Sequence, residues 1–306
     1  MSRAESSVIA DVLAIVGPTA AGKTSAAITV AERIGAEIVS CDSLQLYREL
    51  DIGTAKPTAD ERARVPHHLV DILAPNESCS AARYAELADA AIAAIRARGR
   101  RVIVVGGSGL YFRALRFGLF AAPPRDEELR ARLHDDERAQ PGRLHERLRA
   151  VDGKAAARIA PADLVRLVRA LEVYELTGVP LTEHHALHRP QERVHMDVLN
   201  LEPPFTTLDP RIAARVEAML RGGLVDETRR VLARHGATPP LQSVGYAEVC
   251  ALLAGELRED ELATAIFRAT RHYARRQRTW FKKEPGARRF DSADELTRAI
   301  DAACRP

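Results

Sequence analysis

Residues 12–27 read VLAIVGPTAAGKTSAA, and this stretch decides the fold. Its first five residues are an apolar run, which is typical of a buried strand. Residues 17–24 fit G-x-x-x-x-G-K-[ST], the P-loop that binds phosphate groups. The residues after the loop predict a helix whose N-terminus points at those phosphates. We therefore predict a strand, a phosphate-binding loop and a helix in this order.

Each part of this loop has a physical role in holding an anion. Gly17 and Gly22 allow backbone conformations that turn successive N–H groups toward one anion. Lys23 adds a positive charge, and the hydroxyl of Thr24 is available to Mg²⁺. The loop identifies a phosphate ligand without saying that it is ATP. The predicted phosphate-binding residues are Gly17, Pro18, Thr19, Ala20, Ala21, Gly22, Lys23 and Thr24.

The composition is that of a globular protein with nearly balanced charge. The 306 residues suffice for one large domain or two modest ones, and 46% of them are hydrophobic. The net charge of +3 is too small to indicate nucleic-acid binding by itself. The four cysteines form no CxxC pair, which excludes a zinc ribbon and fits a reducing compartment. Because the sequence has no signal-peptide core and no membrane-length apolar run, we expect a cytoplasmic protein that binds no membrane.

Apolar runs after the P-loop predict that a sheet continues along the chain and is interrupted by a helical segment. At about Gly118 the apolar runs give way to a charged, helical segment, and Pro123-Pro124 marks a boundary. The fold class that we predict is α/β. It is a P-loop NTPase-like parallel sheet with helices on both faces and an all-helical insertion domain at 119–192, between core segments 1–118 and 193–306. The expected strands are 12–16, 36–41, 69–73, 101–105, 195–201 and 288–290.

Asp42 stands where the strand at 36–41 should end. In open α/β sheets ligands gather at the carboxyl ends of strands, so Asp42 is a candidate general base that faces the P-loop. The sequence from Asp42 to Gln45 also fits a capping box, with Asp at the N-cap of a helix and Gln three residues later. Spacing alone leaves both roles open. One carboxylate serves both only if one of its oxygens remains free.

Gly106-Gly107-Ser108-Gly109 follows the predicted strand at 101–105. A glycine-rich turn at the carboxyl end of a strand lets a ligand approach the backbone, and it leaves Ser108 as the one hydroxyl. An ordinary turn between a strand and a helix explains the same residues equally well.

The last long helix, expected over 259–283, carries basic residues at steps of three and four, which makes a stripe about 20 Å long. No acidic residue occurs from 262 to 283, whereas an ordinary solvated face carries both signs. The stripe favours a polyanion such as a phosphate backbone. Its members are Arg268, Arg271, Arg275, Arg278 and Lys282. The expected apolar side of the same helix is Leu262, Ile266, Ala269, Tyr273 and Trp280.

Several motifs together resemble those of the tRNA dimethylallyltransferases, also called tRNA isopentenyltransferases. The matching pieces span about residues 12–283 and occur in the family's order. No single piece after the P-loop is specific, but the ordered set is. The pieces are the P-loop, DSLQLY at 42–47, DIGTAKP at 51–57, HHLVD at 67–71, VGGSGLYFR at 105–113, RLVRALEV at 166–173, SVGY at 243–246, ATR at 269–271 and RRQRTW at 275–280.

This resemblance implies a reaction. Enzymes of the family move a dimethylallyl group from dimethylallyl diphosphate to atom N6 of the adenosine that lies just 3′ of the tRNA anticodon. The P-loop is then expected to hold a diphosphate that leaves, with Mg²⁺ at Thr24 as cofactor. Asp42 is expected to take the proton of the adenine amine. The target base would leave the stack of the anticodon loop and enter a pocket that excludes water.

The resemblance also implies which residues act. Asp42, Ser108 and Lys23 are the expected catalytic residues. The expected partners are dimethylallyl diphosphate and the anticodon stem-loop of tRNA, bound by a monomer. The expected tRNA-binding residues are Asp42, Ser43, Leu44, Gln45, Ser108, Arg130, Val165, Arg166, Arg169, Gln242, Gly245, Arg275, Arg276, Arg278 and Lys282.

The sequence departs from the family at two places. Ser108 stands where the family usually has Thr, which keeps the hydroxyl. Residues 159–163 read Ile-Ala-Pro-Ala-Asp where the family has Ile-His-Pro-Asn-Asp, so the His and Asn side chains are missing. Two alternatives from other classes are a small-molecule kinase on the same P-loop fold and a non-catalytic RNA-binding module. The first requires phosphoryl transfer from ATP, and the second requires RNA binding without prenyl transfer.

Overall fold

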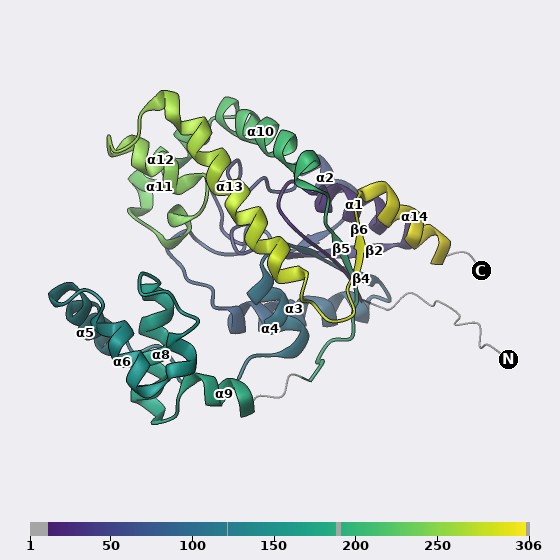
Figure 1. Cartoon of the computed structure of the whole chain (residues 1–306). Coiled ribbons are helices and arrows are strands. Elements are labelled where there is room, and N and C mark those ends of the chain that lie inside the picture. Colours follow the sequence, from purple (N-terminus) through teal and green to yellow (C-terminus); the bar gives the residue numbers. More distant parts are fainter. Residues whose placement is uncertain (1–11, 121, 188–190, 304–306) are drawn as a thin grey trace. The chain divides into compact units, whose positions relative to one another are not determined.

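The structure is a computed structural model that describes residues 12–120, 122–187 and 191–303 (Figure 1). The chain divides into two compact units. The larger unit comprises residues 1–116 and 193–306, and the smaller unit comprises residues 117–192.

A six-stranded sheet forms the centre of the larger unit, and all of its neighbouring strands run parallel. The order across the sheet is β3-β2-β4-β1-β5-β6. The strand that precedes the P-loop therefore lies between β4 and β5, with Val16 opposite Gly106 on one side and Asn200 on the other. The strands are β1 (Val12–Val16), β2 (Ala36–Cys41), β3 (His67–His68), β4 (Arg101–Gly106), β5 (Asp197–Leu201) and β6 (Arg288–Phe290).

Helices cover both faces of this sheet. The connection from β1 to β2 crosses the sheet in one direction, and the connection from β2 to β4 returns in the other. Because such crossovers are right-handed, α1 and α3 lie on opposite faces. The α/β fold predicted from the sequence is confirmed. The helices of this unit are α1 (Lys23–Ile34), α2 (Ala59–Arg64), α3 (Ala81–Ala97), α4 (Gly109–Phe117), α10 (Phe205–Arg221), α11 (Leu224–His235), α12 (Tyr246–Leu253), α13 (Glu259–Phe281) and α14 (Ala293–Ala303).

The core of the larger unit is the sheet itself. Every residue of β1 and of β2 is buried, as are all but the first residues of β4 and β5. Strands that are covered on both faces read as continuous apolar runs, which is why β1, β2 and β4 could be located from the sequence. The carboxyl ends of these strands lie at one edge, where the P-loop, Asp42 and Gly107 follow them.

The smaller unit is all-helical and has a core of its own. Leu129, Leu133, Leu144 and Leu148, the sparse apolar residues of a highly charged segment, are all buried there. They pack with residues of the later helix that begins after Asp163, whose carboxylate caps it by accepting a hydrogen bond from the N–H of Arg166. The helices are α5 (Glu127–Ala139), α6 (Arg143–Val151), α7 (Gly153–Ala156), α8 (Leu164–Thr177) and α9 (Leu181–Leu187).

One fully buried carboxylate organises the start of this unit. Glu172, on α8, accepts two hydrogen bonds from Arg130, at 2.7 and 2.9 Å, and a third from Arg169. The backbone N–H of Asp126 also donates to it, at 3.0 Å. Arg169 in turn donates to the carbonyl oxygen of Pro123 at 3.0 Å. The cluster therefore fastens the segment 123–126 and α5 to α8.

Three local predictions need correction. The short strand expected at 69–73 lies instead at His67–His68, and Leu69 and Asp71 have positive φ angles that no regular strand accepts. The first helix begins at Lys23 and not at residue 25, because Gly22 in the left-handed region serves as its N-cap. The buried side of α13 includes Leu262 and Ile266 as expected, but it then departs from the expected Ala269, Tyr273 and Trp280. It runs through Leu262, Ile266, Thr270, Ala274, Gln277 and Phe281.

None of the helices within the described residues has both the length and the apolar composition that crossing a bilayer requires.

The Glu172 cluster predicts an acid-sensitive smaller unit. Burial alone would raise the pKa of Glu172, but hydrogen bonds from Arg130, Arg169 and the N–H of Asp126 outweigh it and lower the pKa to about 2. A lowered carboxyl pKa stabilises the fold at pH values above about 4.5, and this stability is lost as the pH falls through about 2. The contribution is about 3 kcal/mol. We expect the stability of the smaller unit to fall less steeply with decreasing pH in Glu172→Gln than in the wild type.

The measurement is amide hydrogen exchange in α5 and α8 between pH 6 and pH 2.5, with intrinsic exchange rates taken into account. Glu128→Gln, at an exposed position of α5, is the matched control and should follow the wild type. The same loss of stability at acid pH in the wild type and in Glu172→Gln would contradict the assigned role of Glu172.

Candidate active site

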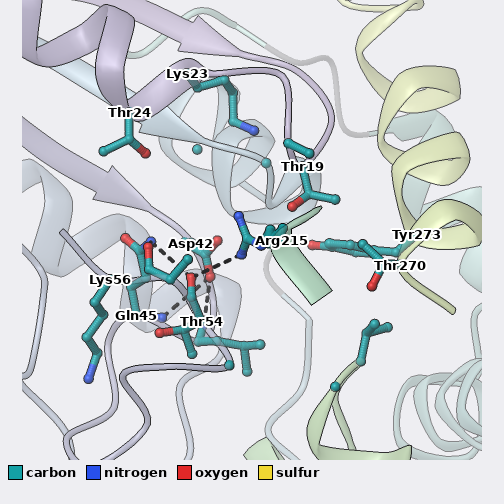
Figure 2. Close-up of a pocket in the computed structure, with 18 of the residues that line it drawn as sticks. Thr19, Lys23, Thr24, Asp42, Gln45, Thr54, Lys56, Arg215, Thr270 and Tyr273 are labelled. Atoms are coloured by element: carbon teal, nitrogen blue, oxygen red, sulfur yellow. Dashed lines mark hydrogen bonds between the residues drawn. The ribbon is translucent and has the colours of Figure 1, made fainter. Parts of the chain in front are cut away.

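A pocket of about 690 Å³ lies in the larger unit, at the carboxyl edge of the sheet (Figure 2). The P-loop, the turn after β2 and the turn after β4 supply its strand side. Helices α10 and α13 and the segment 242–245 supply the opposite side. The pocket therefore lies where the loops of parallel strands meet, which is where ligands bind in open α/β sheets.

The P-loop is shaped by two glycines that have different reasons to be glycine. Gly17 has a φ of 137°, and a Cβ atom there would stand 2.2 Å from the carbonyl oxygen of Leu201. Gly22 has open space around it, but its φ of 95° is one that side chains rarely adopt. The helix that starts at Lys23 turns its free N–H groups toward the pocket, which is a site for an anion.

Asp42 is positioned by its own turn. Its Oδ1 accepts hydrogen bonds from the N–H groups of Leu44, at 2.9 Å, and Gln45, at 3.4 Å. No helix follows, and the side chain of Gln45 bonds instead with Ser40, Thr54 and Ala55, so the capping-box interpretation is wrong. Within the described residues no hydrogen bond reaches Oδ2 of Asp42. One oxygen therefore fixes the carboxylate and the other is available to a ligand.

Two cations share the pocket with Asp42. Lys23 donates a hydrogen bond to the carbonyl oxygen of Pro18 at 2.6 Å, and Arg215 donates to that of Thr54 at 3.5 Å. Figure 2 shows the guanidinium of Arg215 directed toward Asp42, with Lys23 near the P-loop. Neither cation forms an ion pair within 4.0 Å among the described residues. The centre of the pocket is therefore net positive and suited to a multiply charged anion.

The environment changes the acid–base properties of both cations. Loss of water around its ammonium group lowers the pKa of Lys23 to about 8, although the charge of Asp42 opposes this. Desolvation likewise lowers the pKa of Arg215, against the same opposing charge. Both groups gain from a bound anion, because it replaces the water that they have lost.

A buried carboxylate holds the loop at 51–56, which forms one wall of the pocket. Glu227, on α11, accepts hydrogen bonds from the backbone N–H groups of Asp51, Ile52 and Gly53. The hydroxyl of Tyr246 donates to the same carboxylate at 2.7 Å. A Cβ atom at Gly53 would stand 2.4 Å from the ring of Tyr246, so a side chain has no room there. The wall is thus held from behind by a carboxylate that is not one of the residues lining the pocket.

Ser108 lies beside the pocket and is not one of its lining residues. Its hydroxyl accepts a hydrogen bond from the N–H of Ser43 at 2.9 Å and lies 3.3 Å from the Ser43 hydroxyl. Its own N–H donates to the carbonyl oxygen of Cys41 at 3.2 Å. These bonds join the turn after β4 to the turn that carries Asp42. The catalytic role expected of Ser108 stays a prediction, and the role that its contacts support is to hold Asp42 in place.

The far side of the pocket has an apolar patch. Tyr273, on α13, is one of the residues that line this side. Burial raises the pKa of Tyr273 well above its usual value, and the charge of Asp42 adds to this, so the hydroxyl keeps its proton. Such a surface accepts a short hydrocarbon chain beside the charged cradle. The other apolar lining residues from α10, α13 and the segment 242–245 are Val216, Met219, Val244 and Ile266.

The basic stripe of α13 is shorter than expected. Arg271 is ion-paired with Asp209 at 2.8 Å and Arg278 with Glu202 at 2.7 Å. Both guanidinium groups also flank the ring of Phe205, at 4.9 and 5.4 Å. Both acidic partners come from segments outside 262–283, so the absence of acids within that range did not indicate an unpaired stripe. The members that remain exposed are Arg268, Arg275 and Lys282, with Arg276 beside them.

The predicted nucleic-acid contacts are spread over both units. Ser43, Leu44, Gln45, Gln242, Gly245 and Arg276 line the pocket. In the smaller unit, Arg130 and Arg169 are held by Glu172, whereas Val165 is 79% exposed and Arg166 has a 70% exposed side chain. Val165 and Arg166, at the start of α8, are therefore the exposed members in this unit, and Arg166 also forms an ion pair with Asp163 at 3.5 Å.

Four residues that line the pocket were not predicted from the sequence as site residues. Arg211 and Arg215 lie one helical turn apart on α10, which is a signal, but one that many arginine pairs of this chain share. Tyr273 was assigned to an apolar face rather than to a pocket. Nothing in the sequence indicated that Gln277, on α13, contacts the P-loop, where it accepts a hydrogen bond from the N–H of Thr19 at 2.8 Å.

Comparison with known proteins agrees with this geometry. The sequence model of the family described as IPP transferase matches residues 45–284. A tRNA dimethylallyltransferase of Anaeromyxobacter sp. (strain Fw109-5) is 52% identical over 297 residues, which cover 94% of this chain and 98% of that protein. The tRNA dimethylallyltransferase of Myxococcus xanthus (strain DK1622) is 46% identical over 95% of this chain and 96% of its own length.

Solved structures share the fold as well. The full-length tRNA isopentenylpyrophosphate transferase of Bacillus halodurans is 36% identical, with a TM-score of 0.71 over 95% of this chain and 96% of that one. A eukaryotic dimethylallyltransferase acting on tRNA is 26% identical, with a TM-score of 0.79 over 96% of this chain and 80% of its own. Matching motifs, sequence identity along nearly the whole chain and a shared fold lead to one conclusion: this chain belongs to the IPP transferase family.

Proposed function

We propose that the chain transfers a dimethylallyl group from dimethylallyl diphosphate to N6 of the adenosine 3′-adjacent to the anticodon of tRNA, position 37. The observation that carries the proposal is the composition of the pocket. The lining brings together an anion cradle that contains Lys23 and Arg215, an apolar patch that includes Tyr273, and the carboxylate of Asp42. A diphosphate, a short hydrocarbon and an amine that must lose a proton match these three surfaces in turn.

The transfer balances as a single displacement. The lone pair of the N6 amine attacks C1 of the dimethylallyl group, and the bond from C1 to the diphosphate oxygen breaks. The diphosphate leaves with the electron pair of that bond. The amine proton goes to Asp42, whose Oδ2 has no other partner among the described residues. The products are N6-(dimethylallyl)adenosine and diphosphate.

The cradle stabilises the charge that develops on the leaving group. Backbone N–H groups at the start of α1, the ammonium of Lys23 and the guanidinium of Arg215 are already in place before the reaction, so no reorganisation is needed then. Burial of the pocket strengthens each of these interactions and protects the allylic carbon from water.

A magnesium ion fits this cradle as a companion of the diphosphate. The described residues hold no group of three or more His, Cys, Asp or Glu side chains suited to a metal. Thr24 places a hydroxyl in the pocket, and it has no hydrogen-bond partner among the described residues. Mg²⁺ commonly takes one or two protein oxygens together with phosphate oxygens and water. Bound there, it would neutralise charge on the departing diphosphate.

We assign RNA contact to the exposed basic residues that line or neighbour the pocket on α13. Arg276 lines the pocket, and Arg275 is exposed beside it. Phosphate contacts of this kind position an RNA without reading its sequence. Val165 and Arg166 of the smaller unit are proposed as a second contact, because their side chains are exposed.

The test mixes the protein with Mg²⁺, labelled dimethylallyl diphosphate and an anticodon stem-loop that carries the target adenosine, without ATP. We expect label on the RNA, and none on a stem-loop with guanosine at that position. Phosphorylation of a small acceptor by ATP without prenyl transfer would instead support a kinase. RNA binding without any chemistry would support a binding module.

Asp42→Asn is the matched variant in that assay. The amide oxygen can still accept from Leu44 and Gln45, so the turn should persist, while the proton acceptor is lost. We expect kcat to fall by about 10²- to 10⁴-fold with RNA affinity nearly unchanged. A normal kcat, or a loss confined to RNA binding, would mean that Asp42 only shapes its turn.

The pKa of Lys23 predicts how pyrophosphate binding depends on pH. The ammonium binds an anion only while protonated, so affinity should fall as the pH rises through about 8. Between pH 7 and pH 9 we expect Kd for inorganic pyrophosphate to rise in the wild type by roughly tenfold more than it rises in Lys23→Met. Isothermal titration calorimetry measures this, with Lys154→Met, an exposed lysine of α7, as control. Parallel pH profiles for the wild type and Lys23→Met would count against the assignment.

Two arginines of α13 should separate binding from stability. Arg275→Ala should lower the slope of log K against log salt for the stem-loop by about one, because one phosphate contact is lost. Arg278→Ala should leave that slope unchanged and lower the unfolding free energy by roughly 1–3 kcal/mol, because Glu202 loses its cation. Salt titrations of RNA binding and urea unfolding measure the two effects. A lower salt slope for Arg278→Ala would contradict this division, because Arg278 would then contact RNA phosphate as the full basic stripe requires.

A further inference from the structure

Gln277 joins two loops that lie far apart in the sequence. Its Oε1 accepts a hydrogen bond from the N–H of Thr19 in the P-loop at 2.8 Å. Its Nε2 donates to the carbonyl oxygen of Gly107, in the turn after β4, at 3.0 Å. The residue is 6% exposed, so water does not compete for these bonds. One side chain of α13 thus spans the gap between the ends of β1 and β4.

The chemistry of this link suits a primary amide. The N–H of Thr19 needs an acceptor, and the carbonyl of Gly107 needs a donor. An amide side chain offers both, whereas a carboxylate has no donor and an aliphatic side chain has neither. A Cβ atom at Gly107 would stand 2.1 Å from Nε2 of Gln277, so the fit leaves no room for another side chain.

The link continues to the proposed base. The residue after Gly107 is Ser108, whose N–H donates to the carbonyl oxygen of Cys41 and whose hydroxyl accepts from the N–H of Ser43. Cys41 and Ser43 flank Asp42 in the sequence. A continuous path of hydrogen bonds therefore runs from the P-loop through Gln277 and the turn after β4 to the turn that carries Asp42.

We propose that Gln277 is a positioning residue that holds the anion cradle in register with Asp42. This inference rests on the proposed function, because it assigns the leaving diphosphate to one end of the path and the proton acceptor to the other. In a displacement, the attacking amine and the departing oxygen must lie on opposite sides of one carbon. A misplacement of about 1 Å between the groups that hold them costs on the order of 10²-fold in rate. The hydrogen bonds of the Gln277 side chain go to these two loops and not to Lys23 or Asp42, so the residue acts through the loops.

The first test is Gln277→Leu, which has a similar volume and neither polar atom. We expect kcat for prenyl transfer to fall by about 10- to 100-fold. Kd for inorganic pyrophosphate and for the stem-loop should change by less than about threefold, because Lys23, Arg215 and the exposed arginines remain. The Thr19 amide should exchange its hydrogen faster than in the wild type. Leu262→Ala, a buried change on the same helix outside the pocket, controls for a general loss of stability.

The second test uses Gln277→Glu to separate positioning from packing. A carboxylate keeps the acceptor for Thr19 but places a charge against the Gly107 carbonyl. When protonated, it regains a donor and reproduces the amide pattern. The kcat of this variant relative to the wild type should therefore rise as the pH falls. The same ratio for Gln277→Leu should stay constant.

The outcomes are distinct. A wild type that transfers no label to RNA overturns the proposed function and this inference with it. An active wild type with unchanged kcat in both variants overturns the inference alone. So does a loss of kcat that Leu262→Ala reproduces, or a Gln277→Glu ratio that does not change with pH.

Discussion

The common direction of the sheet strands is the constraint on which the rest of the structure depends. Because β1, β2 and β4 run parallel, the loops that follow them meet at one edge, and these loops bring the P-loop, Asp42 and Gly107 to the candidate site. Apolar side chains buried on both faces fix the register of these strands. The P-loop and the end of β5 lie close together, because a Cβ atom at Gly17 would stand 2.2 Å from the Leu201 carbonyl oxygen.

Buried polar side chains then hold the loops, which have no regular structure of their own. Glu227 accepts hydrogen bonds from three backbone N–H groups of the loop at 51–53. Gln277 forms hydrogen bonds with both the P-loop and the turn after β4. Both come from helices that cover the site. In a buried setting a satisfied hydrogen bond is strong and an unsatisfied group is costly, so each contact selects one loop conformation. The helices thereby set the shape of the pocket.

The sequence by itself determined the class of fold and the position of the P-loop within it. Val12–Val16 and the P-loop after it form a local pattern whose meaning does not depend on distant residues. The buried strands could be located for the same reason, because strands covered on both faces are continuous apolar runs. Asp42 could be named as a candidate because it ends such a run, although its spacing to Gln45 indicated a helix cap equally well. The family resemblance rested on the order of short motifs, which is also information along the chain.

Only the tertiary structure decided how charged and polar side chains are used, because their partners are distant in sequence. Arg278 and Arg275 are neighbours on one helix, yet Glu202 pairs with the first and leaves the second exposed. Arg130 and Arg169 bind a buried carboxylate, whereas Arg215 points into the pocket. Gln277 reaches across 258 residues to Thr19. A pattern along the chain shows which face of a helix a residue occupies. What stands opposite that face is decided by folding, and for a charge the opposite group determines whether it stabilises the protein or binds a ligand.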